Sequence, residues 1–287
     1  MIMTGLIYDI NLHTRTFSLK IGKNLKFFYV TNSLMKKFKK YFYEGTLVTF
    51  VCDDECIKRH KVMSYAVAYF KEIATPTKFG IIIHYSKESI ARELKDFINS
   101  LDNLMFIDLE MSMPGYSDNK DFLIELIQAS YIITDNKFDT ITQHDFHIVP
   151  TINKFLTDRC EQFLNITYDQ LLFKGVEFPK FYEQFKSDLK DYNPTIIIFG
   201  KNDRMFLEKA YKTNECESLQ GISRFVNLSQ LLKNYYDLTQ DPGLFKSYEI
   251  MYNDNLPAQR HDAYEDAYYT LKVYEKFKEI VENNIKA

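Results

Sequence analysis

The sequence contains few cysteines and no long apolar run. Four of its 287 residues are cysteine, namely Cys52, Cys56, Cys160 and Cys216. Thiols this few and this scattered do not build a disulfide scaffold, which fits a reducing cytosol. No apolar run reaches the roughly eighteen residues of a membrane-spanning helix, and the first residues lack the pattern of a secretory signal. We therefore expect a cytoplasmic protein that is neither secreted nor embedded in a membrane.

Internal repeats and low-complexity tracts are absent as well. The hydrophobic share of 46% is ample for a core, and 287 residues suffice for one large or two ordinary domains. The net charge of −3 hides an uneven distribution. Residues 1–75 carry 12 Lys and Arg against 6 Asp and Glu, a net +6, whereas the remaining residues carry 24 against 33, a net −9.

The basic first part is predicted to be a small β-rich domain. Three strands, a helix and two further strands follow one another, which is the order of an OB-type barrel. The predicted strands span 5–10, 16–21, 25–30, 46–52 and 62–70, and the predicted helix spans 33–42.

Aromatic and lysine side chains interleave along these strands. Tyr8, Phe27 and Tyr65 are examples of the rings, and Lys26 and Lys61 are examples of the cations. Such a pattern suits base stacking beside phosphate contacts on a single strand. The alternative is that most of these rings are simply core residues.

Residues 76–102 are predicted to connect two domains. Thr75-Pro76-Thr77 indicates a break, and a short strand near 79–84 and a helix over 86–101 follow. The predicted organisation is therefore a β-rich domain over 1–75, a connector over 76–102 and an α/β domain over 103–287. Cys52, Cys56 and His60 are zinc-ligand types, but the alternative of ordinary thiols at a strand end is favoured because no fourth ligand is nearby.

The stretch Leu104–Glu110 is the centre of the second domain. Four apolar residues run directly into Asp108-Leu109-Glu110, which predicts a buried central strand that ends at a site. Because side chains alternate along a strand, Asp108 and Glu110 point to the same face. Two carboxylates this close repel each other unless a cation or a shared proton offsets the repulsion, so a hard divalent ion is the expected partner. The alternative is a solvated strand end or a helix-capping pair.

Two later segments supply further polar groups. A buried strand around Ile196 is followed by a helix that carries Asp203, and near the end of the chain His261 precedes a helix that contains Asp266. The order Asp-x-Glu, then Asp, then His with Asp five residues later resembles the DEDDh 3′-to-5′ exonucleases. The resemblance covers about residues 104–278.

The resemblance implies a metal site with four carboxylates and a histidine. An oxygen-rich ligand set favours Mg²⁺ or Mn²⁺ over zinc, and two such ions about 4 Å apart are implied. Asp108 would bridge both ions. Glu110 and Asp266 would hold the ion that carries the attacking water, and Asp203 would position the second ion through water. His261 would take the proton from that water, since its unperturbed pKa is about 6.5; the alternative is an exposed helix cap.

The resemblance also implies supporting roles and a fold. Met111 and Ser112 would lie against the terminal nucleotide, and Glu125 would support the site without binding metal. No role is implied for Arg204. The implied fold is α/β: a ribonuclease H-like mixed sheet flanked by helices, preceded here by the OB-like barrel. Within it we expect an antiparallel pair over 122–134 and 140–149 and helices over 153–163 and 178–189.

These expectations combine into one function. We expect a metal-dependent 3′-to-5′ exonuclease on single-stranded nucleic acid, with RNA somewhat preferred, and with the basic domain holding the strand through phosphate contacts. One alternative is a DNA-processing or proofreading 3′-to-5′ exonuclease, because both acids share the scissile chemistry and differ in the 2′-hydroxyl. The other is a non-catalytic nucleic-acid-binding protein on a nuclease fold. The alternatives for the basic domain are that it binds a protein partner or only braces the fold.

Overall fold

The computed structural model describes residues 1–59, 62–116, 122–219, 221–238, 240–257 and 260–283. The chain forms two compact units, Met1–Leu94 and Lys95–Ala287. His60 of the zinc alternative and Lys61 of the aromatic and lysine pattern lie outside the described residues. Among the helices that are described, none combines the length and the apolarity needed to cross a membrane.

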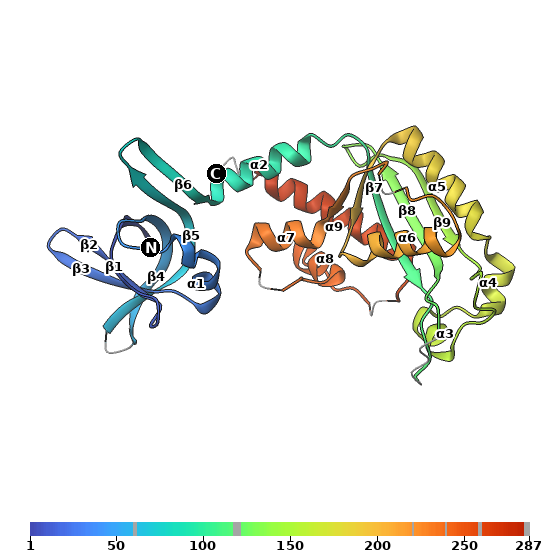
Figure 1. Ribbon diagram of the computed structural model, residues 1–287, viewed down its shortest axis with the longest axis horizontal. Helices are drawn as coiled ribbons and strands as arrows, with labels where there is room; N and C mark the ends of the chain where they lie inside the picture. Colours follow the sequence, from blue (N-terminus) through green and yellow to red (C-terminus); the bar gives the residue numbers. More distant parts are fainter. Residues whose placement is uncertain (60–61, 117–121, 220, 239, 258–259, 284–287) are drawn as a thin grey trace. The chain divides into compact units, whose positions relative to one another are not determined.

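The first unit is a closed β-barrel with one additional strand (Figure 1). Its strands follow the order β3-β2-β1-β4-β5-β6, and a parallel pairing of β3 with β5 closes the barrel. The expected OB-like order of three strands, a helix and two strands is confirmed. The elements are β1 (Ile2–Asn11), β2 (Thr16–Ile21), β3 (Asn24–Tyr29), α1 (Asn32–Phe38), η1 (Lys39–Tyr41), β4 (Leu47–Arg59), β5 (Val62–Thr77), β6 (Gly80–Ser86) and α2 (Lys87–Asn99).

Aromatic rings fill the interior of this barrel. Phe17, Phe28, Phe50 and Phe70 are buried and pack against one another with ring centroids 4.8–5.8 Å apart. Alternation along each strand explains this, since every second side chain points inward. These four rings are therefore core residues and are not available for stacking on bases.

The predicted break between domains at Thr75-Pro76-Thr77 is wrong, because the strand continues through this segment. It forms the end of β5 and pairs with β6 as far as Thr77 opposite Gly80. Pro76 has no N–H to donate, and it is tolerated because the pairing of β5 with β4 ends at Ala74, so one edge of β5 is free there. The predicted strand near 79–84 therefore belongs to the barrel sheet as β6.

The second unit has a five-stranded mixed sheet with helices on both faces. The strand order is β11-β10-β7-β8-β9, in which β7 pairs in parallel with β10 and antiparallel with β8. The expected mixed sheet and its antiparallel pair are confirmed. The elements are β7 (Leu104–Met111), β8 (Leu126–Thr134), β9 (Thr140–His147), α3 (Asp158–Leu164), α4 (Tyr168–Lys174), α5 (Phe178–Tyr192), β10 (Thr195–Ile198), α6 (Asn202–Thr213), β11 (Phe225–Asn227), α7 (Leu228–Tyr236), α8 (Leu244–Tyr252) and α9 (Ala263–Asn283).

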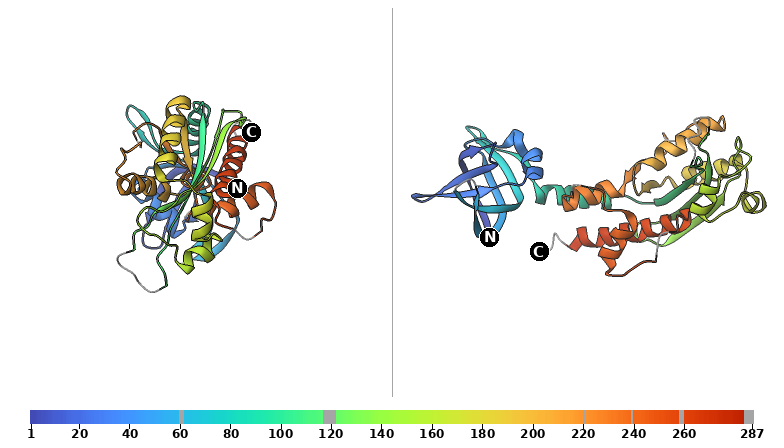
Figure 2. Two further views of the ribbon diagram at one scale, coloured as in Figure 1. Left: turned by 90° about the vertical axis from the view of Figure 1, so that its right-hand side faces the viewer. Right: turned by 90° about the horizontal axis from the view of Figure 1, so that it is seen from below.

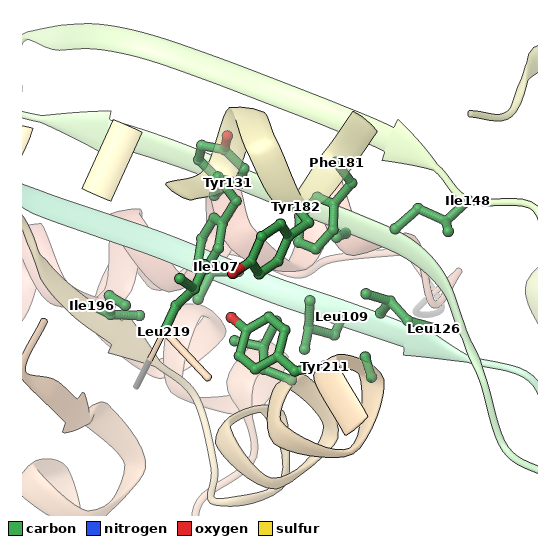
Figure 3. Close-up of a cluster of buried hydrophobic side chains, with 14 of the residues drawn as sticks. Ile107, Leu109, Leu126, Tyr131, Ile148, Phe181, Tyr182, Ile196, Tyr211 and Leu219 are labelled. Atoms are coloured by element: carbon green, nitrogen blue, oxygen red, sulfur yellow. The ribbon is translucent and has the colours of Figure 1, made fainter. Parts of the chain in front are cut away.

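The central strand β7 separates two packed layers. Ile107 and Leu109 lie in the main core cluster with residues of α5 and α6, as Figure 3 shows for Tyr182 and Tyr211. On the other face Phe106 packs against Tyr274 of α9, with ring centroids 5.6 Å apart. Figure 2 shows α5 and α9 on opposite sides of the sheet. Alternation therefore places Asp108 and Glu110 on the face that α9 covers.

Several elements differ from the predicted ones. β8 begins at Leu126 and not near residue 122, and α3 begins at Asp158 and not at 153. The reason is local, because the hydroxyl of Thr157 accepts the backbone N–H of Cys160 and so caps α3 at that point. The helices α4, α7 and α8 were not predicted, since each has only seven to nine residues, which is too short for a helical repeat to stand out in the sequence.

Candidate active site

Two strand ends and one helix start bring the acidic residues together. β7 carries Asp108 and Glu110 on its α9 face. The parallel neighbour β10 ends at Ile198, and Gly200 then turns the chain with φ +125°, a conformation that only glycine adopts readily. The helix α6 begins two residues later, so Asp203 lies buried in its first turn.

The start of α9 is fixed by a short polar network. The Oδ1 atom of Asp262 accepts the backbone N–H groups of Tyr264 and Glu265, both at 3.0 Å, which makes Asp262 the N-terminal cap of α9. Gln128 of β8 donates through Nε2 to Asp262 Oδ2 at 3.3 Å and accepts the N–H of Ala263 at 3.3 Å. This network ties α9 to the sheet and sets the position of Asp266 one turn further on.

His261 lies directly beside two of the carboxylates. One ligand atom each from Glu110, His261 and Asp266 lie within 4.8 Å of one another. The backbone of His261 has φ +52°, and its ring stacks on Phe163 of α3 with centroids 4.0 Å apart and an interplanar angle of 24°. Stacking on Phe163 limits rotation of the imidazole ring and so keeps it facing the acidic cluster.

Burial and the neighbouring carboxylates raise the pKa values of Asp108 and Glu110. Burial, followed by the charges of Asp203, Asp266 and Glu110, raises the pKa of Asp108 well above its usual range. Burial and then the charges of Asp266 and Asp203 raise the pKa of Glu110 to about 8.

The pKa values of Asp203 and His261 are also shifted. Burial raises the pKa of Asp203 to about 6, although a backbone hydrogen bond at its helix start opposes the shift. Burial lowers the pKa of His261. The structure thus brings together all five residues that the sequence singles out.

This cluster fits divalent cations by its donor chemistry. Four carboxylates supply only oxygen ligands, which Mg²⁺ and Mn²⁺ prefer, and the groups are too close together to be ionised at once without a positive charge. The imidazole of His261 is a fifth possible ligand at the same place. The residues that would hold the metal are therefore Asp108, Glu110, Asp203 and Asp266.

Met111 and Ser112 are engaged within the protein. The side chain of Met111 belongs to the main core cluster, and the hydroxyl of Ser112 accepts the backbone N–H of Glu125 at 2.9 Å. Their contact with a terminal nucleotide stays a prediction. Arg204 extends from α6 with its guanidinium 5.4 Å from the ring of Phe225.

Glu125 has the structural role that the resemblance implies. Its buried carboxylate accepts the backbone N–H groups of Thr151, Ile152 and Asn153 at 2.6–2.8 Å, and the Asn153 side-chain amide at 2.7 Å. These bonds hold the loop after β9 against the end of β7.

Three contributors to the site were missed at the level of sequence. The cap residue Asp262 is followed by Glu265 three residues later, which is a recognisable helix-start signal. Gln128 carries no such signal because its partner Asp262 is 134 residues away. Phe163 is likewise distant in sequence from His261, so only the fold reveals their stacking.

The raised pKa values predict how pH and metal affect stability. A carboxyl group whose pKa is higher in the folded protein binds its proton more tightly there. The free energy of unfolding of the metal-free protein therefore falls as pH rises from the ordinary value of 4.5 for Glu110 toward about 8. A divalent cation replaces the protons, so we expect it to stabilise the protein much more at about pH 8 than at about pH 5.5.

Thermal unfolding with EDTA and with Mg²⁺ at both pH values checks this expectation. The Glu110→Gln variant should show a shallower loss of melting temperature in EDTA, because one titrating group is gone. An equal effect of Mg²⁺ at the two pH values would contradict the coupling.

Comparison with known proteins agrees with this geometry. Residues 105–274 match the family model RNase T, described as an exonuclease. No curated protein sequence matches the chain. The nuclease domain of 3'hExo, a DEDDh family member bound to rAMP, superposes with a TM-score of 0.56 at 17% identity, covering 63% of this chain and 94% of that one.

Two further solved structures share the fold. A 3'-exonuclease solved for 3'-end specific recognition of a histone mRNA stem-loop has a TM-score of 0.55 at 16% identity and covers 63% of this chain and 83% of that one. Cell-death related nuclease 4 (CRN-4) has a TM-score of 0.53 at 18% identity and covers 63% and 64%. At such identities the likeness establishes a common architecture for the second unit.

Proposed function

The chain belongs to the RNase T exonuclease family, and from this membership we propose that it is a metal-dependent 3′-to-5′ exonuclease. The substrate we propose is single-stranded nucleic acid, with RNA preferred over DNA. The observation that carries the proposal is the meeting of Asp108, Glu110, Asp203 and Asp266 with His261 at the end of β7. A set of acids of this kind, intact in an exonuclease domain, supports catalysis over mere binding.

The carboxylates would act by holding divalent cations. Such ions supply the positive charge that stabilises the attacking and leaving oxygens of an in-line phosphoryl displacement. Asp108, Glu110, Asp203 and Asp266 would hold these cations, in the roles that the family resemblance implies. The burial that raises the pKa values of Asp108 and Glu110 would also strengthen their hold on a cation, because little water competes with the ligands.

His261 would act as the general base. An effective base must be unprotonated at working pH, and burial lowers the pKa of His261 from its ordinary value, which keeps the imidazole neutral near pH 7. The ring is held by Phe163 on one side and lies beside Glu110 and Asp266. It would accept a proton from the attacking water and then pass it to solvent.

The preference for RNA is the second part of the proposal. Two of the structurally similar proteins are described with a ribonucleotide or an mRNA stem-loop. Discrimination requires a contact with the 2′-hydroxyl. The segment at Met111 and Ser112 that follows the Asp-x-Glu motif is our candidate for the terminal-nucleotide contact.

A matched pair of substrates tests the proposal. We expect the full chain with Mg²⁺ to shorten labelled single-stranded RNA faster than DNA of the same sequence, and EDTA to stop both reactions. Activity on DNA alone would overturn the RNA preference and favour a DNA-processing or proofreading enzyme. Binding of both strands without hydrolysis under any metal condition would favour a non-catalytic protein on a nuclease fold.

A further inference from the structure

Two arginines of the first unit converge on one tyrosine. The guanidinium carbon of Arg59 lies 3.9 Å from the ring centroid of Tyr29, and that of Arg15 lies 5.5 Å from it. The three residues come from different segments: Arg59 ends β4, Tyr29 ends β3, and Arg15 lies in the loop between β1 and β2. The closed barrel therefore brings two positive charges to one place.

No acidic side chain neutralises this pair within the described part of the chain. The two guanidinium groups have the Tyr29 ring as their recorded partner there, and neither forms an ion pair with a described carboxylate. The Nε atom of Arg59 is buried and has no hydrogen-bond partner among the described residues. Two positive charges that face the same ring repel each other, and a bound anion would offset the repulsion.

The loop that carries Arg15 is held in a fixed shape. The side-chain oxygen of Asn11 accepts the backbone N–H groups of His13 and Thr14, both at 3.0 Å, and the carbonyl of Arg15 accepts the N–H of Val30 at 2.9 Å. Arg15 itself has φ +57°, which few residues other than glycine adopt. The loop thus places a long cationic side chain where glycine would fit more easily.

The chemistry of the pair favours phosphate over other anions. A guanidinium group can donate two parallel hydrogen bonds to phosphate while its plane stacks on an aromatic face, which Tyr29 provides. Phe28 points into the barrel core, so Phe27 lies on the same side of β3 as Tyr29, half-buried. A half-exposed ring on the same side of the strand as Tyr29 suits a base beside its phosphate.

We propose that Arg15, Arg59 and Tyr29 form a backbone-phosphate site for single-stranded nucleic acid, with Phe27 stacking on a neighbouring base. The ligand class rests on the proposed function, whereas the anion site rests on the paired arginines alone. Residues 1–94 carry 15 Lys and Arg against 8 Asp and Glu, so a polyanion is also attracted to the unit as a whole.

Binding without turnover tests the site. Fluorescence anisotropy in EDTA would follow a labelled oligouridylate of about 20 nucleotides on the full chain and on the Arg15→Gln/Arg59→Gln variant. We expect binding at least about tenfold weaker and a slope of log K against log salt smaller by about 0.7 for each phosphate that the two arginines neutralise on a single strand. The matched control is Lys58→Gln/Lys78→Gln, which removes the same charge from exposed positions of the same unit and should leave the slope nearly unchanged.

A charge-preserving variant separates the contribution of the planar guanidinium donors from that of the positive charge. Arg15→Lys/Arg59→Lys keeps both positive charges but loses the planar donors, so we expect weaker binding with most of the salt dependence retained. Circular dichroism shows whether each variant is folded. If Arg15→Gln/Arg59→Gln unfolds, the binding measured for Arg15→Lys/Arg59→Lys tests the proposal. Unchanged affinity and unchanged salt slope in a folded arginine variant would overturn the proposal.

The outcome is independent of the nuclease assay. If the arginine variants lose binding but the parent never hydrolyses nucleic acid, the phosphate site stands and the proposed function fails. The opposite outcome is that the parent and the arginine variants hydrolyse a dinucleotide at the same rate and bind the long strand equally well. In that case the proposed nuclease function stands and the proposed phosphate site fails.

Discussion

Replacing Asp108 by asparagine is expected to remove nearly all hydrolysis, by about 10⁴-fold or more. Asp108 lies among the three other carboxylates that would hold the cations. Loss of several kcal/mol of charge stabilisation corresponds to about tenfold in rate for each 1.36 kcal/mol. The side chain keeps its size, so the fold should be unchanged. The removed charge also relieves repulsion from Asp203, Asp266 and Glu110.

The measurement is the single-turnover rate on labelled RNA at saturating Mg²⁺, together with the melting temperature in EDTA. We expect the rate to collapse while the metal-free protein melts at the same or a higher temperature. Asp139→Asn, which neutralises an exposed acid between β8 and β9, is the matched control and should be fully active. A nearly normal rate for Asp108→Asn would show that the chemistry lies elsewhere.

Replacing His261 by alanine is expected to slow hydrolysis by about 10² to 10⁴, the usual contribution of general acid–base catalysis. Metal affinity and strand binding should change little, because the four carboxylates remain. The pH dependence should change as well: the limb of the rate profile that reports the base, shifted to lower pH by burial of His261, should disappear.

The position of His261 makes this experiment decisive about its role. Its ring nitrogen lies as close to Glu110 and Asp266 as a metal ligand would. Titration of Mn²⁺ into the parent and into His261→Ala separates the two roles. A joint fall of rate and metal affinity would identify His261 as a ligand and would contradict its assignment as the base.

The sequence predicts the centre of the second unit well because the signals there are local. An unbroken apolar run into Asp108 and Glu110 predicts a buried strand with a polar end, and the structure makes it the middle strand of five. The OB-like order of the first unit also follows from short, clearly bounded segments. The sequence pattern did not predict that β5 continues through Pro76. A proline is acceptable there only because the pairing of β5 with β4 ends at Ala74.

The parts that escaped prediction depend on contacts between distant segments. Phe163 and His261 are close only because α3 folds back beside the start of α9. The same holds for Gln128, whose amide links β8 to the cap of α9, and for Arg15 and Arg59, which meet on Tyr29 through barrel closure. In each case the sequence shows the residue type, whereas only the fold determines which residue it contacts.

The most direct test of the central claim follows one labelled end during hydrolysis. RNA labelled at its 5′ end and incubated with the full chain and Mg²⁺ should give a ladder that shortens one nucleotide at a time from the 3′ end, and a 3′-blocking group should delay it. Immediate release of the labelled terminal nucleotide, or fragments from internal cuts, would contradict a 3′-to-5′ exonuclease centred on Asp108 and Glu110.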